Sequence, residues 1–172
     1  GLIKRENLGM IRGRTRRNQL DMAKKYGIEN PPNAGGGCLL TEPHFGIKAK
    51  DLFSHTENPT INDIDLLKIG RHFRLDEETK FIVGRNKDEN EMIKAISLPG
   101  DILLEAKDFV GPVSILRGSN AKKHLKFASS ITLRYSDAPN DEQAIVSIKD
   151  NELVEEIASQ SAEEESYIQF RM

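Results

Sequence analysis

The stretch FIVGRNKDENE, residues 81–91, decides how the second half of this chain should fold. Its first three residues form a short apolar run, which is typical of a strand buried on both faces. Gly84 interrupts this run, and Asn86 has the side chain of a helix N-cap. Glu89 lies three residues later, where a carboxylate can reach back to the N–H of the cap residue. The pattern therefore predicts a strand, a tight turn and the start of a helix.

The same turn is a candidate site for a phosphate or a nucleic-acid backbone. The predicted geometry leaves Arg85, Asn86 and Asn90 at the mouth of the turn. Backbone N–H groups at a helix N-terminus attract anions, and a guanidinium beside them adds to this effect. Helix capping alone also explains Asn86 and Glu89, so Arg85 is the residue for which a binding role is the stronger interpretation.

A hairpin is predicted just before this turn. Residues 71–75 alternate, so Phe73 and Leu75 should face one way and His72 and Arg74 the other. Residues 76–79 form a polar turn and residues 80–84 return. Arg71, His72 and Arg74 could extend the basic surface of Arg85. For His72, an ordinary exposed or hydrogen-bonded histidine is the alternative.

Further strands are predicted around residues 102–104, 113–116 and 144–148. A helix capped by Ser119 or Asn120 should run to about residue 135. Lys122, Lys123 and Lys126 crowd its polar face, where either solvation or RNA contact would account for them. In residues 151–172 the pattern suggests a short helix at 153–157, a strand at 167–170 and an acidic surface run at 163–165.

The front of the chain is rich in arginine. Residues 12–27, RGRTRRNQLDMAKKYG, fit a helix with a narrow apolar stripe that ends at Gly27. A solvated helix face is one interpretation of its charges. The other is phosphate contact, because the planar guanidinium binds phosphate well and few acids lie nearby. The candidate phosphate-binding residues here are Arg12, Arg14, Arg16 and Arg17.

A Pro-Gly connector, IENPPNAGGGCLLT at residues 28–41, follows and excludes regular structure. Cys38 adjoins three glycines. It could be a small buried residue of a linker, part of a nest of N–H groups that grips a phosphate, or a reactive thiol. A metal site would require His44, His55 or His72 to converge on it, and no ligand spacing supports that.

Composition sets outer limits on the class of protein. The chain has 172 residues, a net charge of −2 and one cysteine. A single cysteine cannot form an internal disulfide, and no apolar run approaches the length of a membrane span, so we expect a cytoplasmic location. The basic residues concentrate at the front: residues 1–50 hold ten Lys/Arg and four Asp/Glu, whereas residues 151–172 hold one and six. Nucleic-acid contact should therefore involve the front.

Two family resemblances sharpen these expectations. VGRNKDENEMI at 83–93 and DILLEAKDFVGPVSILRG at 101–118 resemble the RNA-binding domain of the NFACT ribosome-quality-control proteins, over roughly residues 67–148. That family shows a G-R-N-x-x-x-N turn into a helix, then an aspartate-led strand and a Gly-rich crossing to another strand. The resemblance implies an RNA-binding domain.

The second resemblance covers residues 12–28, the run NPPNAGGGCLLTEPHFGIKAKDLF at 30–53, and LLKIGRHFRL at 66–75. These segments look like the C-terminal half of PP-loop ATPase-type tRNA-thiouridine-synthase-like proteins. The nucleotide-binding Ser-Gly-Gly-x-Asp-Ser loop of that family is absent, as is a P-loop. The resemblance implies that ATP would be bound by a further N-terminal domain, and that no cofactor binds here.

Together these signals predict an α/β (α+β) chain. We expect a helical, Arg-rich segment with its connector at residues 1–66, and a mixed β-sheet packed with two or three helices at residues 67–172. The leading functional hypothesis is binding of tRNA or another structured RNA within a tRNA-thiolation protein. Catalysis of sulfur transfer or metal-assisted thiolation by Cys38 is one alternative, and a protein–protein docking module using the acidic tail is another. No complete catalytic centre is recognisable in the sequence.

Overall fold

The computed structural model describes residues 16–29, 31, 39 and 42–172. The chain divides into two compact units, Gly1–Glu42 and Pro43–Met172. In the first unit, helix α1 spans Arg17–Lys25 and buries Ala23. Gly27 follows with a positive φ of 69°, a conformation that glycine adopts without strain. The predicted end of this helix at Gly27 is therefore confirmed.

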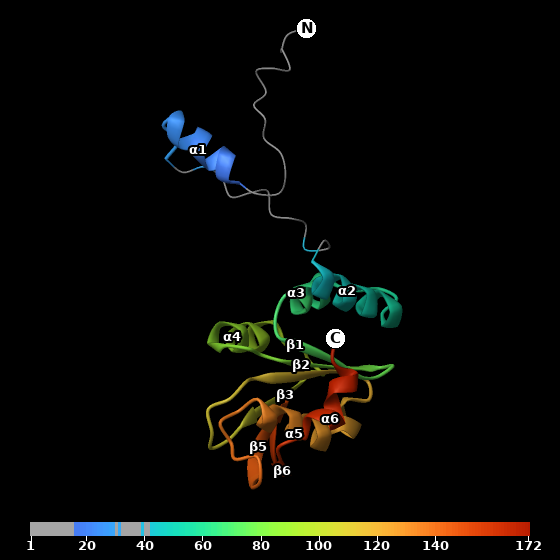
Figure 1. The fold of residues 1–172 in the computed structure, drawn as a ribbon. Helices are drawn as coiled ribbons and strands as arrows, with labels where there is room; N and C mark the ends of the chain where they lie inside the picture. Colours follow the sequence, from blue (N-terminus) through green and yellow to red (C-terminus); the bar gives the residue numbers. More distant parts are fainter. Residues whose placement is uncertain (1–15, 30, 32–38, 40–41) are drawn as a thin grey trace. The chain divides into compact units, whose positions relative to one another are not determined.

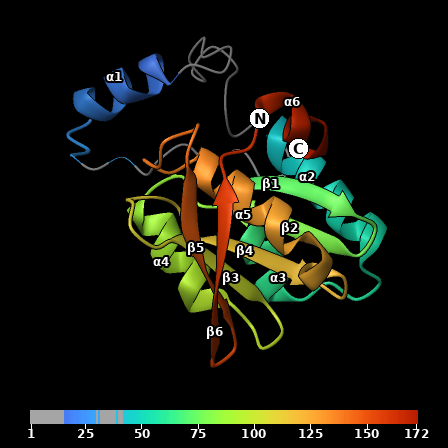
Figure 2. The same ribbon diagram turned by 90° about the horizontal axis from the view of Figure 1, so that it is seen from below.

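The second unit is built on one six-stranded sheet in the order β1-β2-β4-β3-β5-β6, drawn in Figures 1 and 2. Each pairing of neighbouring strands is antiparallel. The strands are β1 Arg71–Asp76, β2 Thr79–Val83, β3 Ile102–Ala106, β4 Ser114–Gly118, β5 Gln143–Asp150 and β6 Leu153–Gln160.

Helices cover both faces of this sheet. In Figure 1, α2, α3 and α4 lie on one side of the sheet and α5 lies on the other. The helices are α2 Pro43–His55, α3 Ile61–Leu67, α4 Lys87–Ile96, the 3-10 turn η3 Ala121–His124, α5 Leu125–Arg134, α6 Glu164–Tyr167 and the 3-10 turn η4 Ile168–Phe170.

Two main apolar clusters hold these layers together. On the α5 side, Phe73, Phe81 and Val146 pack with Ile131 of the helix. On the opposite side, Ile82 and Ile115 pack with residues of α3 and α4. Alternate residues of β2 therefore enter different clusters, and all five residues of the strand are buried. The predicted doubly buried strand after residue 80 is confirmed.

The end of the chain completes the sheet at β1. The N–H of Met172 donates to the carbonyl of His72 at 3.0 Å, and Arg171 forms a bridge with Phe73. Tyr167 is buried and meets Phe73 edge to face, with ring centroids 5.9 Å apart. Residues 151–172 are thus part of the folded domain. The prediction of a helix and then a strand in this region was wrong, because β6 precedes α6 and η4.

The α+β class is confirmed, with two differences from the sequence-based expectation. All described strand pairs are antiparallel, where a mixed sheet was expected. Strand β4 pairs with β2 on one side and with β3 on the other, and it is antiparallel to both. The units divide at Glu42 and Pro43 instead of near residue 66. The reason is that Leu66 of α3 belongs to a core cluster with Ile82 and Ile115 of the sheet. Among the described residues, none forms a helix with the length and apolarity that crossing a bilayer requires.

Candidate nucleic-acid interface

The turn after β2 has the predicted form, but most of its polar groups are used internally. The Asn86 side chain accepts a hydrogen bond from the N–H of Glu89 at 3.0 Å, which confirms the N-cap. The Glu89 carboxylate accepts from the N–H of Arg85 at 2.8 Å and from that of Gly70 at 3.2 Å, in place of the expected bond to the cap residue. It also pairs with the Arg85 guanidinium, with Nε and Oε1 2.9 Å apart. Although burial favours the protonated acid, these hydrogen bonds and the charge of Arg85 hold the pKa of Glu89 below its ordinary value.

Asn90 holds the turn against the loop between β3 and β4. Its Oδ1 accepts from the N–H of Val113 at 3.0 Å, and its Nδ2 donates to the carbonyl of Gly111 at 3.3 Å. A side chain at Gly84 would collide with Oδ1 of Asn90. The spacing G-R-N-x-x-x-N is therefore explained by packing of a turn, a helix and a loop. Arg85 remains the exposed cation of this turn, with half of its side chain accessible.

The basic residues of β1 do not form one surface. Arg71 lies over the ring of Tyr135, with its guanidinium carbon 4.6 Å from the centroid, on the α5 side of the sheet. Arg74 lies on the other side, where its Nε and Nη2 contact the Asp51 carboxylate of α2 at 2.9 and 2.6 Å. Alternation along the strand separates the two guanidinium groups. The predicted continuous face of Arg71, Arg74 and Arg85 is therefore wrong.

His72 was predicted as an RNA contact, and the structure contradicts this, since only 1% of the residue is exposed. Its Nε2 lies 2.7 Å from the carbonyl oxygen of Ile69. Burial, followed by the charges of Lys80 and Lys48, lowers the pKa of His72 well below its usual value, so the ring is neutral at pH 7. His72 and Arg74 share a face, as predicted, but α2 covers that face.

The N-terminal candidates belong to the other unit. Arg17 is exposed on α1 and Arg16 precedes it at the N-cap position, where it is half-buried. Arg12, Arg14 and Cys38 lie outside the described residues. Their proposed roles stay predictions.

Three lysines gather where η3 leads into α5, and we call Lys122, Lys123 and Lys126 the lysine edge. All three are exposed. Lys122 pairs with Asp150 at 2.9 Å, and this hydrogen bond and charge raise the pKa of Lys122. Within the part of the chain that the structure describes, neither Lys123 nor Lys126 has an ion-pair partner. The amino end of the helical run 121–134 adds positive potential at the same place, because the Asn120 side chain makes no capping bond there.

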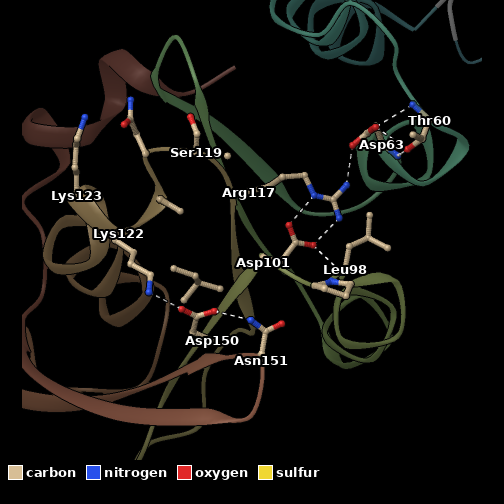
Figure 3. Close-up of a pocket in the computed structure, with 16 residues that line it drawn as sticks. Thr60, Asp63, Leu98, Asp101, Arg117, Ser119, Lys122, Lys123, Asp150 and Asn151 are labelled. Carbon is tan, nitrogen blue, oxygen red and sulfur yellow. Dashed lines mark hydrogen bonds and ion pairs between the residues drawn. The ribbon is translucent and has the colours of Figure 1, made fainter.

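A cavity of about 870 Å³ adjoins the lysine edge, and we call it the Arg117 cavity (Figure 3). Lys122 and Lys123 lie on one side of the cavity, and the side chain of Arg117 extends away from them towards Asp101 and Asp63 on the other side. Ile102 and Ala121, which are buried, contribute apolar surface. The site thus combines cationic side chains with an apolar lining at one end of the sheet.

Arg117 is locked in one orientation by two carboxylates. Its Nε and Nη2 contact Asp101 at 2.8 and 2.6 Å, and its Nη1 contacts Asp63 at 2.8 Å. Burial disfavours the charge, yet the hydrogen bonds and charges of Asp101 and Asp63 raise the pKa of Arg117. Asp63 is itself fixed by Thr60 in a capping box at the start of α3. The guanidinium is therefore a rigid, permanently charged plane beside the cavity.

Sequence reasoning missed this cavity and the role of Arg117. The only local signal was the run RGSN at 117–120, which was interpreted as the end of a strand and the start of a helix. A side chain at Gly118 would collide with the carbonyl of Glu78, and its φ of 136° is one that other residues rarely adopt. The partners Asp63 and Asp101 lie far from Arg117 in the sequence, so no spacing could reveal them.

The described residues contain no group of three or more His, Cys, Asp or Glu side chains that could hold a metal ion. Of the cationic residues around the Arg117 cavity, Arg117 and Lys122 are paired with carboxylates, whereas Lys123 has no ion-pair partner among the described residues. This arrangement suits the recognition of an anionic ligand more than it suits metal coordination.

The family comparison places this α+β domain in the RNA-binding class. The chain belongs to the NFACT RNA-binding domain family: a family model described as "NFACT protein RNA binding domain" matches residues 70–171, which include all six strands. The predicted resemblance to this family is thereby confirmed. The family match does not extend to a PP-loop ATPase, so the link to thiolation stays a prediction.

A solved structure supports the fold independently. The C-terminal region of the fibronectin/fibrinogen-binding protein from Streptococcus suis matches with a TM-score of 0.50 over 90% of this chain and 75% of that chain. The two sequences are 14% identical, so the similarity concerns the fold alone. No curated protein gave a significant match.

Proposed function

We propose that this chain binds the phosphate backbone of a structured RNA, with tRNA as the expected ligand, through the lysine edge. The observation that carries the proposal is the position of Lys123 and Lys126 in a domain of the NFACT RNA-binding family. Both are exposed at the amino end of a helical run, and neither has an ion-pair partner among the described residues. Their charges are thus available to an external anion.

The chemistry favours recognition of shape and charge over recognition of sequence. Lysine is a flexible point charge, which binds phosphate without reading base edges. Double-stranded RNA presents its phosphates and 2′-hydroxyls in a regular array, which suits such contacts. Arg16 and Arg17 of the first unit, together with Arg12 and Arg14, would add affinity of the same non-specific kind.

The decisive measurement is RNA affinity as a function of salt concentration. We expect Lys123→Ala/Lys126→Ala to weaken binding of a tRNA and to lower the slope of log K against log salt by roughly 1.5, since each lost phosphate contact removes about 0.7–0.9. The matched control is Lys50→Ala/Lys149→Ala, which removes two exposed lysines from α2 and β5. The control should leave the slope within about half a unit of the wild-type value.

Two results would contradict the proposal. One is the absence of tRNA binding by the wild-type chain at low salt. The other is an equal loss of affinity in the lysine-edge variant and its control, because that result would assign binding to net charge alone. Arg85→Ala provides a further comparison, since Arg85 is half exposed but is paired with Glu89.

For the wider role we propose a tRNA-thiolation protein, in which a separate ATP-binding domain would perform the activation step. Its support is the sequence resemblance through the run AGGGCLLT at residues 34–41. The test is whether thiolated nucleosides disappear from total tRNA when the encoding gene is deleted. Their return with the wild-type gene, but not with one encoding the lysine-edge variant, would show that RNA binding through the lysine edge is needed for thiolation.

A further inference from the structure

The Arg117 cavity has features that contact with a double helix does not need. Phosphates of a duplex would meet the exposed lysines at the rim, whereas the cavity extends inward to buried Ile102 and Ala121. Its volume of about 870 Å³ lies in the range of pockets that enclose small organic ligands. A single nucleotide fits such a space, and a base-paired helix does not.

The lining divides into parts that match the parts of a nucleotide. Lys122 and Lys123 supply positive charge at one wall, which suits a phosphate (Figure 3). Leu98 and Pro99 offer apolar surface, which suits the faces of a base. Asn151, at the turn between β5 and β6, donates one N–H to Asp150 at 3.0 Å, which leaves its second N–H and its carbonyl oxygen for a base edge.

The guanidinium of Arg117 can take the place of an aromatic platform. No aromatic side chain is among the residues that line this cavity. Arginine planes also stack on unpaired bases in RNA complexes. Because Asp101 and Asp63 bind three of its nitrogens, Arg117 keeps one orientation and loses little freedom when a base covers it.

We propose that the Arg117 cavity binds one unpaired nucleotide next to a helical stem, with its phosphate at Lys122 and Lys123 and its base against the guanidinium plane of Arg117. This inference rests on the proposed RNA-binding function and names the kind of RNA that it prefers. The preferred ligand is a stem that ends in a single-stranded overhang or carries a bulged nucleotide, and a blunt stem binds more weakly.

The experiment compares two hairpin RNAs with the same stem, one blunt and one with a one-nucleotide 3′ overhang. We expect the overhang to bind roughly 5- to 100-fold more tightly, which is the range for one stacked base. Equal affinities would overturn this inference and leave the backbone-binding function intact. If neither hairpin binds at low salt, the proposed function itself fails.

A substitution locates the preference. Arg117→Lys keeps the charge and removes the plane, so the overhang should lose most of its advantage while the blunt hairpin binds as before. Arg134→Lys, at the end of α5, is the matched control and should retain the advantage. If a folded Arg117→Lys protein keeps the full preference for the overhang, the base does not lie on Arg117.

Free mononucleotides distinguish a nucleotide within RNA from a small-molecule ligand. AMP or CMP at millimolar concentration should lower the affinity for the overhang hairpin towards that for the blunt hairpin and leave binding of the blunt hairpin unchanged. Micromolar binding of either mononucleotide without RNA would instead identify a small-molecule site and would overturn the inference.

Discussion

Asp150 restrains one of the three lysines of the lysine edge. Its carboxylate pairs with Lys122 and also places a negative charge beside the proposed path of the RNA. Asp150→Asn keeps the shape of the side chain, releases Lys122 and removes that charge. We expect about two- to fivefold tighter binding of a hairpin RNA at low salt, because an exposed ion pair of this kind is weak and competes little with a phosphate.

The gain from Asp150→Asn should disappear at high salt, where exposed charges are screened. Asp108→Asn, in the loop after β3, is the control for the change in net charge. Affinity measurements by fluorescence anisotropy at low and high salt test both variants. An equal gain from the control would assign the effect to overall charge and would argue against a local role of Lys122.

Asp76 gives the domain a sensitivity to acid. Slight burial favours the neutral form, but hydrogen bonds from the His124 ring and the N–H of Glu78 lower the pKa of Asp76 to about 2. The unfolded chain has the ordinary value of 3.8, so it binds the proton first. The stability that Asp76 contributes is thus complete above about pH 4 and is lost as the pH falls towards 2.

Urea denaturation from pH 5 to pH 2 tests this dependence. The wild-type free energy of unfolding should fall over that interval, and Asp76→Asn should show a shallower fall, with lower stability at pH 5. Since the pKa values of Asp51, Asp63 and Glu89 are also lowered, part of the acid dependence will persist in the variant. Parallel curves for the two proteins would contradict the assignment to Asp76.

At the scale of elements, the capping box of α3 connects helix formation to the cavity. The Thr60 hydroxyl accepts from the N–H of Asp63 at 3.2 Å, and Asp63 in turn binds Arg117. We expect Thr60→Ala to lower the free energy of unfolding by about 1 kcal/mol, within the range for a lost N-cap. Urea denaturation measures the loss, with Thr56→Ala, just before this turn, as the control. An unchanged midpoint would show that the box does not stabilise α3.

Local signals in the sequence predicted the hairpin of β1 and β2, the cap at Asn86 and the start of α4. They failed for β6, because its residues are mostly exposed and leave no burial pattern to detect. They also failed for the face of β1 that carries His72. The alternation of side chains along β1 was predicted correctly. Helix α2, which covers this face, lies about 20 residues away in sequence, so the local pattern gave no sign of it. The Arg117 cavity was unpredictable for the same reason, since long-range pairing creates it.

At the scale of the whole molecule, the two units predict how truncations will behave. A fragment of residues 43–172 contains the complete sheet and its helices, so it should fold with a thermal midpoint within a few degrees of the full chain. A fragment ending at residue 150 lacks β6 and Tyr167, which is buried against Phe73. We expect that fragment to remain unfolded, because the loss of β6 and Tyr167 exposes a large part of the α5-side core.

Circular dichroism and amide NMR spectra of the two fragments check this expectation. A folded 1–150 fragment would show that residues 151–172 are not needed for folding. A fragment 43–172 that fails to fold would contradict the division at Glu42 and Pro43. If it folds, it also provides the material for RNA measurements without the arginines of the first unit.

The closure of β1 by Arg171 and Met172 limits how copies of this domain can aggregate. A sheet with two open edges can add strands from neighbours without end, and this is how fibres grow. In residues 43–172 one edge is blocked at His72 and Phe73, while the strand order ends at β6 on the other side. Two copies joined through β6 would consume both open edges, and growth would stop there. Removing the last two residues would therefore turn a self-limiting contact into one that can propagate.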